Sequence, residues 1–242
     1  MDSTSRVQTR PLWPLLTAFS IAYSFFLTAP AIFHQEFPLR RDMEWGDVLD
    51  ILTPFVVFGF VWLLVRRTVG TFDTVVAFPL LLIALVWTQG QGMHLASNSI
   101  GHQVAEDASG ALPGLIDFYD EKLSHYIWYL GVVVLPIYLL VVMWRDRGLA
   151  SGGRPFPVLP GALLFGIVLG VDAIEAAVVP MALPVFMLTV LLAAYLHRNV
   201  PRLRGVELFT FIGASVIVAL GTLLGWGAYH GGWPEPSDLG LI

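Results

Sequence analysis

The chain has 242 residues, of which 56% are hydrophobic and only 13% are charged, and its formal net charge is -5. Soluble domains carry about a quarter of charged residues, so this composition, with a mean hydropathy of +0.73, indicates an integral membrane protein. The absence of cysteine excludes disulfides and thiolate metal sites, and the lack of a basic stripe argues against a nucleic-acid partner. We therefore expect one membrane-embedded helical domain over residues 1–242.

Seven apolar runs follow one another, each close to the ~20 residues that a helix needs to span a bilayer. They lack the alternating pattern of a membrane β-barrel, and the first is long enough for a span rather than a cleaved signal peptide. The fifth and sixth runs meet with almost no loop, as a tight hairpin or a re-entrant pair. The expected spans are residues 12–33, 48–66, 72–94, 123–144, 158–179, 181–197 and 206–229.

The basic residues predict how this seven-helix bundle is oriented in a cell membrane. If all seven runs cross, ten of the thirteen lysines and arginines fall on one side. Cytoplasmic loops carry the excess of Lys and Arg, so the N-terminus is expected inside and the C-terminus outside. The ten residues on the inner side are Arg6, Arg10, Arg66, Arg67, Arg145, Arg147, Arg154, Arg198, Arg202 and Arg204.

Two pairs of glycines have the GxxxG spacing that lets membrane helices approach closely. Gly166 and Gly170 lie on the fifth run, and Gly221 and Gly225 lie on the seventh. Such pairs serve packing inside a bundle or between copies of a chain. We expect packing within the bundle, and a homo-oligomer remains an alternative.

Polar residues in the third run form a stripe along one helix face. Gln91, His94, Asn98 and His102 follow one another at steps of three and four, so the helix is expected to continue toward Val104. Five of the six histidines map to the outer side or the outer half of a helix. Ionisable groups at membrane depth are costly and normally face the bundle interior, so the outer half is the candidate functional region.

The fourth and fifth runs add carboxylates at matching depth. Glu121 and His125 are four residues apart on one face, and a carboxylate at that spacing can share a metal with an imidazole or orient it. Asp172 and Glu175 are three residues apart in an otherwise apolar helix with no basic residue nearby. Buried anions need partners, so the outer histidines, a metal ion or protons are expected beside them.

Histidine and carboxylate without cysteine is the ligand set of zinc in hydrolytic sites and of non-haem iron. We predict His94, His125 and Glu175 as ligands of a divalent metal, with Glu121 and Asp172 in catalytic or ligand-orienting roles. Because this site would open to the outer leaflet or the outer aqueous phase, the predicted function is metal-dependent hydrolysis of a lipid or a lipid-linked substrate.

Other classes of function fit the same residues. The cluster could form the ion or proton pathway of a transporter, whose discontinuous helices Pro180 and Pro184 would suit. His94 and His125 could hold haem or a quinone, or the cluster could only stabilise the bundle. In architecture the chain resembles the seven-helix membrane hydrolases related to alkaline ceramidases and progestin/adiponectin receptors. That resemblance implies a histidine-held zinc, although their paired C-terminal histidines, HxxxH, are absent here.

Overall fold

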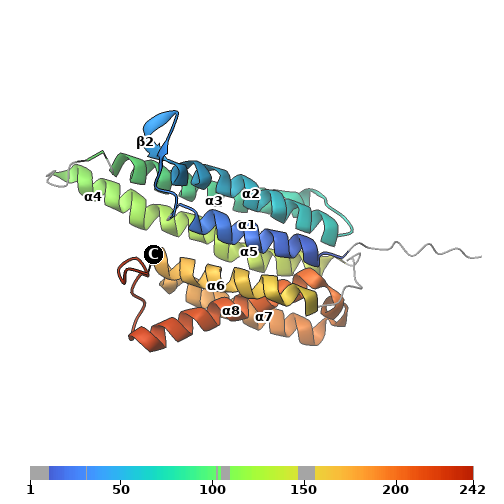
Figure 1. The fold of residues 1–242 in the computed structure, drawn as a ribbon. Coiled ribbons are helices and arrows are strands. Elements are labelled where there is room, and N and C mark those ends of the chain that lie inside the picture. Colours follow the sequence, from blue (N-terminus) through green and yellow to red (C-terminus); the bar gives the residue numbers. More distant parts are fainter. Residues whose placement is uncertain (1–10, 31, 102, 105–109, 147–155, 242) are drawn as a thin grey trace, which may run out of the picture.

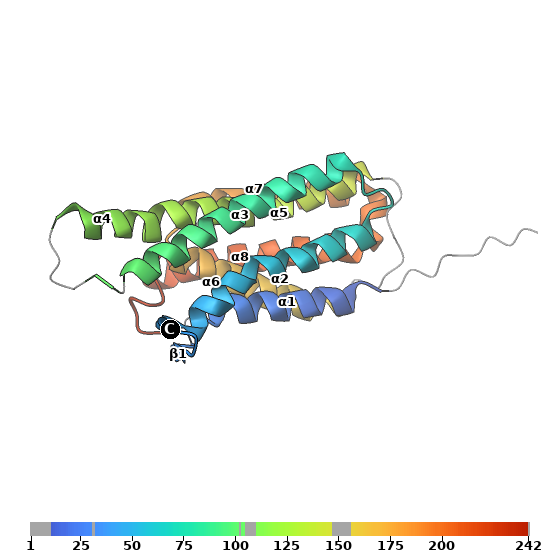
Figure 2. The same ribbon diagram turned by 90° about the horizontal axis from the view of Figure 1, so that it is seen from above.

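The computed structural model describes residues 11–30, 32–101, 103–104, 110–146 and 156–241, and all long elements in these ranges are helices that lie alongside one another (Figures 1 and 2). In these ranges six helices are long and apolar enough to cross a membrane, which supports a multi-pass membrane protein. The helices are α1 (Trp13–Thr28), α2 (Trp45–Thr68), α3 (Thr74–Gly101), α4 (Ala111–Asp117), η1 (Phe118–Ser124), α5 (His125–Arg145), η2 (Phe156–Val158), α6 (Leu159–Glu175), α7 (Val179–Asn199), η3 (Pro201–Gly205) and α8 (Glu207–His230).

The first helix is shorter than the sequence predicted. α1 has 16 residues and ends at Thr28, whereas the apolar run suggested a helix to residue 33. Pro30 follows the last turn of α1 and lacks the main-chain N–H that would continue the ladder of helical hydrogen bonds, although α2, α3, α5 and α7 each continue through a proline. At 1.5 Å per residue α1 is about 24 Å long, less than the ~30 Å of a bilayer core. A small antiparallel hairpin follows, made by β1 (Glu36–Phe37) and β2 (Arg40–Glu44), which the sequence analysis did not predict.

The helices around the predicted polar stripe are longer than their apolar runs. α3 continues beyond residue 94 to Gly101, which confirms the expected extension. Ahead of the fourth span, the unpredicted helix α4 passes through the π-helical η1 into α5, so that Ala111–Arg145 is one helix of 35 residues. The polar outer end is thus carried on continuous helical backbone rather than on loops.

The junction between the fifth and sixth predicted spans is a tight hairpin, which is one of the two arrangements expected from the sequence. Only residues 176–178 separate α6 from α7, and both spans are long enough to cross a membrane. Ala177 adopts a left-handed conformation with a φ of 52°, and the amides of Ala177 and Val178 bond back to the carbonyls of Ile174 and Ala173. These bonds satisfy the last carbonyls of α6 and reverse the chain.

Glycines set the close approach of two helix pairs. On α6, a Cβ added to Gly166 would lie 2.4 Å from the carbonyl oxygen of Ser215 on α8, and Gly170 is similarly covered by Thr222. This first GxxxG pair therefore packs within the bundle, as expected. No atom of another element lies within 4 Å of such a Cβ at Gly221 or Gly225 among the described residues, so the second pair does not serve this packing.

The second close approach joins α3 to α5 directly below the polar stripe. A Cβ on Gly90 would lie 2.2 Å from the main-chain nitrogen of Trp128, and one on Gly131 would lie 3.1 Å from Trp87. Because His94 is one turn beyond Gly90, and His125 is almost one turn before Trp128, this contact fixes the separation of the two histidines.

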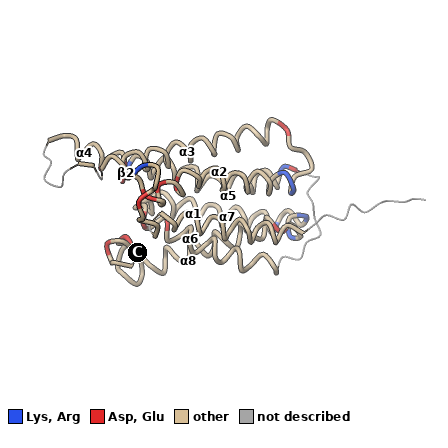
Figure 3. Tube along the Cα trace, turned by 45° about the horizontal axis from the view of Figure 1, so that its top comes forward, with Lys and Arg blue, Asp and Glu red and all other residues tan. Residues whose placement is uncertain are grey.

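Lysine, arginine, aspartate and glutamate gather toward the two ends of the bundle, and the helix segments between them carry almost none (Figure 3). Large side chains such as Phe55, Leu81 and Leu191 are exposed along the helices, as expected for a lipid-facing belt. Arg6, Arg10, Arg147 and Arg154, which contributed to the predicted orientation, lie outside the described residues.

Candidate functional site

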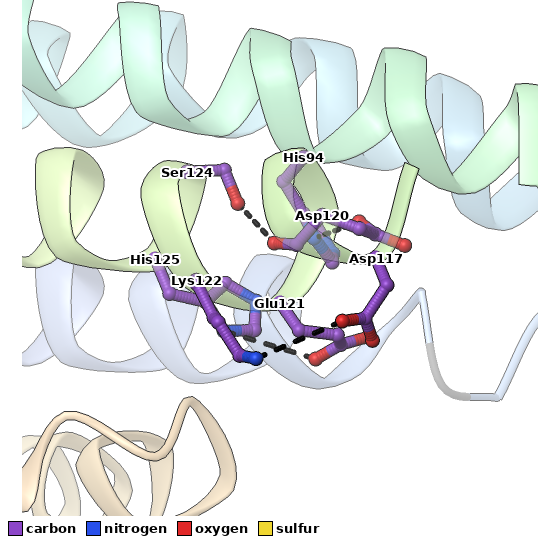
Figure 4. A network of polar contacts seen from close by, with 7 residues as sticks. All are labelled: His94, Asp117, Asp120, Glu121, Lys122, Ser124 and His125. Carbon is purple, nitrogen blue, oxygen red and sulfur yellow. Dashed lines mark hydrogen bonds and ion pairs between the residues drawn. The ribbon is translucent and has the colours of Figure 1, made fainter. Parts of the chain in front are cut away.

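The candidate site lies where the outer part of α3 meets η1 and the start of α5 (Figure 4). His94 projects from α3, Asp120 and Glu121 from η1, and His125 is the first residue of α5. The Nδ1 of His94 lies 2.8 Å from Oδ1 of Asp120, and Nδ1 of His125 lies 4.0 Å from Oε2 of Glu121. The centroids of the two imidazole rings are 4.9 Å apart, so the predicted convergence of the two histidines is confirmed.

The π-helical turn is the local feature that presents both acids. A π-helix bonds residue i to i+5 and is wider than an α-helix, and such turns occur frequently at functional sites. The Ser124 hydroxyl donates to the main-chain carbonyl of Asp120 inside this turn. Asp120 is thereby directed toward His94 on the neighbouring helix, while Glu121 stays near His125 on its own helix.

Several ligand-type atoms in this cluster are buried without a hydrogen bond. Among the described residues, Nδ1 of His94, Oδ1 of Asp120 and Nδ1 of His125 have no hydrogen-bond partner. The 2.8 Å contact between His94 and Asp120 is close but is not directed well enough to be a hydrogen bond. His94 and Asp120 thus meet each other only as an ion pair, and Nδ1 of His125 has no charged partner nearer than Glu121 at 4.0 Å, so the cluster has room for a ligand that the protein itself does not supply.

Tryptophan rings form the floor beneath the histidines. The ring centroid of Trp128 lies 6.4 Å from that of His94 and 6.2 Å from that of His125. The ring centroid of Trp87 lies 6.4 Å from that of Trp128. The indole of Trp87 donates to Oε1 of Gln91 at 2.8 Å, and the Gln91 amide donates to Oδ1 of Asp50 at 2.6 Å. These contacts restrict the polar cluster to the outer part of the bundle.

Asp50 is a site-proximal residue that the sequence analysis missed. It lies on α2, and its carboxylate interacts electrostatically with His94. It could have been found, because an acid inside the second apolar run carries the same cost as Asp172 in the fifth.

The two acids of α6 take different positions. Asp172 lies deeper, near the hydroxyl groups of Tyr23 and Tyr129, and it interacts electrostatically with His94. Glu175 faces the C-terminal segment, where its Oε2 accepts the main-chain N–H of Ser237 at 3.1 Å. As their side chains are placed, no three His, Asp or Glu residues in the described ranges could hold one metal ion. Glu175 as a ligand therefore stays a prediction.

Three further described histidines lie outside this cluster. His34, just before the exposed hairpin, pairs with Glu44 at 3.0 Å, and His230 packs its ring 4.5 Å from that of Trp226 at the end of α8. His197 stacks on Phe209 near the end of α7. His102, the last member of the predicted polar stripe, falls outside the described residues.

The C-terminal segment folds back over the outer ends of α6 and α8. The indole of Trp226 donates to the carbonyl of Pro234 at 3.0 Å, and that of Trp233 donates to Leu223 at 2.8 Å. Partial burial raises the pKa of Glu235, and the neighbouring carboxylates of Asp238 and Glu175 raise it further. The segment therefore adds negative charge beside the site.

Comparison with protein-family models, with curated proteins and with solved structures finds no match for this chain.

Proposed function

We propose that the chain is a membrane-embedded, metal-dependent hydrolase that acts on a lipid or a lipid-linked ester or amide at the outer end of the bundle. The observation that supports it is the set of three buried ligand-type atoms on His94, Asp120 and His125, of which the first two contact each other only as an ion pair at 2.8 Å and the third has no hydrogen bond among the described residues. Imidazole nitrogen and carboxylate oxygen are the ligands of catalytic zinc sites, which use three protein ligands and keep a fourth position open. In this proposal Asp120 is the third ligand, in place of Glu175, which was predicted from the sequence.

The spacing of the two rings suits a shared ion. With a Zn–N distance of about 2.0–2.1 Å and tetrahedral angles, the centroids of two imidazoles on one ion are about 5 Å apart. The observed separation is 4.9 Å. The same spacing disfavours haem, because two axial imidazoles must leave room for the macrocycle between them.

Glu121 is the candidate for proton transfer in this proposal. Its side chain is 54% exposed and lies beside His125, so it can exchange protons with the outer phase. A divalent ion with an open position polarises an ester or amide carbonyl and activates water for attack. Lipid substrates are favoured because the site lies at the polar end of an apolar bundle.

The proposed orientation has seven spans, with α1 as the first, the N-terminus in the cytoplasm and the C-terminus outside. It is supported by the excess of basic residues on one side of the sequence map. A reporter fused after Ile242 should read extracytoplasmic, and one inserted near Gly152 should read cytoplasmic. If both reporters read the same side, the seven-span arrangement is wrong.

The proposed function is tested by metal analysis of the purified protein. Wild-type protein should contain stoichiometric divalent metal and show no Soret absorption, and His94→Ala or His125→Ala should remove the metal. His34→Ala is the matched control, because His34 also pairs with a glutamate but lies just before the exposed hairpin. Asp120→Asn and Glu175→Gln then identify the third ligand. A metal-free wild-type protein, or full metal content in His125→Ala, would contradict the proposal.

A further inference from the structure

We infer that Asp172, with the hydroxyl groups of Tyr23 and Tyr129, forms a second binding site inside the bundle that takes a single positive charge, either Na⁺ or a proton. This site is separate from the histidine cluster, and it does not depend on the proposed hydrolase function. Three helices, α1, α5 and α6, contribute one residue each.

Two polar atoms in this region are buried and unsatisfied. Neither Oδ2 of Asp172 nor the hydroxyl of Tyr23 has a hydrogen-bond partner among the described residues, and Tyr23 is only 1% exposed. The two side chains are nevertheless close enough to interact electrostatically. The ring of Tyr23 packs edge-on against Phe165 at 4.7 Å, two turns before Asp172 on the same face of α6. Two buried unsatisfied oxygens on adjoining helices call for a positive charge or a donor that the described residues do not supply.

The third residue is already oriented by α6. The Tyr129 hydroxyl donates to the carbonyl of Leu169 at 2.8 Å, less than one turn before Asp172, and lies within reach of the Asp172 carboxylate. Its oxygen keeps lone pairs with which it can accept a hydrogen bond from a protonated carboxyl or contact a cation. Carboxylate and hydroxyl oxygens are hard ligands, which favour Na⁺ or a proton over transition metals.

The charge balance around Asp172 calls for one positive charge. Asp172 lies in the last turn of α6, where the helix dipole is negative and disfavours an anion. In the described ranges Asp172 makes no salt bridge with lysine or arginine, and the nearby His94 is engaged with Asp120. Intramembrane acids normally pair or bind ions. The titratable groups that face Asp172 are Tyr23 on α1, Asp50 on α2, His94 on α3, Tyr129 on α5 and Glu175 on α6.

The experiment is thermal unfolding of the detergent-purified full chain, followed by its tryptophan fluorescence. The probe is NaCl, with choline chloride at equal ionic strength as the reference, over a series of pH values. A ligand that binds only the folded state raises the melting temperature in a saturable way. If Na⁺ is the ligand, the wild-type Tm should rise with Na⁺, and Asp172→Asn should abolish the rise. If a proton is the ligand, Na⁺ should have no effect, and wild type should gain stability relative to Asp172→Asn as pH falls.

Two conservative variants allow the test to be completed even if Asp172→Asn does not fold. Tyr23→Phe removes only the unsatisfied hydroxyl and should weaken the response. Tyr138→Phe, which removes a hydroxyl that donates to Val76 at 2.6 Å elsewhere in the bundle, should respond as wild type does. If Asp172→Asn does not fold, a wild-type response in Tyr23→Phe overturns the inference. Identical Na⁺ and pH curves for wild type and Asp172→Asn also overturn it.

Metal content measured on the same samples separates this site from the proposed metal centre. Asp172→Asn should keep its divalent metal, while His125→Ala should lose the metal and keep the Na⁺ or pH response. If Asp172→Asn loses the metal instead, Asp172 belongs to the metal centre, so the second site is refuted while the hydrolase proposal stands. If wild type contains no divalent metal but responds as expected at Asp172, the hydrolase proposal fails and the second site stands.

Discussion

Both ends of the bundle bury carboxylates, but the two ends differ in the hydrogen bonds that these carboxylates accept. At the end where α8 begins, Glu207 is only 4% exposed, and its Oε2 accepts the main-chain N–H groups of Leu12 at 2.5 Å and Trp13 at 2.8 Å. These amides open α1 and have no partner within the helix, so the carboxylate caps it. At the opposite end, Oδ2 of Asp172 has no hydrogen-bond partner among the described residues, and Oδ1 of Asp120 meets only Nδ1 of His94, as an ion pair at 2.8 Å without hydrogen-bond geometry. A satisfied buried acid is structural, whereas an unsatisfied one indicates a ligand.

The basic residues follow the same division. Arg202 donates to the carbonyls of Trp144 and Asp146 after α5, and Arg204 donates to the carbonyls of His197 and Arg198 on α7. Cations at helix C-termini offset the negative end of the helix dipole, so the protein's own arginines satisfy the last carbonyls of α5 and α7. At the opposite end, the exposed side chain of Lys122 pairs with exposed Asp117 at 3.8 Å, whereas the more buried Asp120 pairs with His94. Stability and function are therefore expected to respond to substitutions at different ends.

The largest effect is expected where α3 touches α5. Gly90→Ala would place a Cβ 2.2 Å from the Trp128 nitrogen, which neither helix backbone can accommodate without moving apart. Overpacking of this kind typically costs about 1–3 kcal/mol or more. We expect a large drop in Tm together with loss of bound metal, because the histidines would separate. Gly92→Ala is the control, since nothing lies within 4 Å of its Cβ among the described residues. Equal behaviour of the two variants would contradict the role given to Gly90.

The next largest effect compares stability and metal content in one variant from each end of the bundle. Glu207→Ala removes the acceptor for two amides of α1 and should cost about 1–2 kcal/mol of stability, as loss of a helix cap does, with metal content unchanged. Asp120→Asn should show the reverse, losing metal without loss of stability in the metal-free protein. Unfolding in denaturant and metal analysis of both variants measure the two quantities. If Glu207→Ala also loses its metal, the division between the ends is wrong.

The sequence predicted the membrane helices because hydrophobic length is a one-dimensional property. It also paired His94 with His125, since both lie at the same depth on consecutive spans. It did not predict the π-helical η1, which turns Asp120 rather than Glu121 toward His94. Helix type within a continuous helix depends on packing against neighbouring helices, which a sequence pattern alone does not reveal.

Glu175 shows the other limit of prediction from sequence. Spacing placed it near Asp172, but the last turn of α6 points it at the C-terminal segment, where Ser237 donates to it. That contact joins residues 62 positions apart, and no local pattern reveals it. The fold of the C-terminal segment over Gly227 likewise depends on two tryptophans that could as well have been interfacial anchors.

A smaller effect is expected at Glu121, which supports the site without being a proposed metal ligand. Its carboxylate is 4.0 Å from Nδ1 of His125. Loss of a partner that orients a ligand typically weakens metal binding by about 10–100-fold, whereas loss of a ligand abolishes binding. Glu121→Gln should therefore purify with metal but lose it to a weaker chelator than wild type does. Metal loss as complete as in His125→Ala would make Glu121 a ligand.

The smallest effect concerns the C-terminal segment and pH. The pKa of Glu235 is raised by burial and by the carboxylates of Asp238 and Glu175. An acid whose pKa is higher in the docked state binds its proton more tightly there. Docking is therefore strongest below the ordinary glutamate pKa and weakens as pH rises through the raised value. Because Glu235 is only partly buried, screening by solvent keeps the effect small.

Hydrogen exchange of the Ser237 amide, which donates to Glu175, measures this docking as a function of pH. In wild type, protection should fall as pH rises through the raised pKa of Glu235, after correction for the intrinsic pH dependence of exchange. Glu235→Gln should stay protected across the same range, because the amide carries no charge to repel Asp238 and Glu175. Glu36→Gln, on the exposed hairpin at the same end, should behave as wild type does. Unchanged pH dependence in Glu235→Gln would show that the segment is held by Trp226 and Trp233 alone, and that its negative charge does not act on the site beside it.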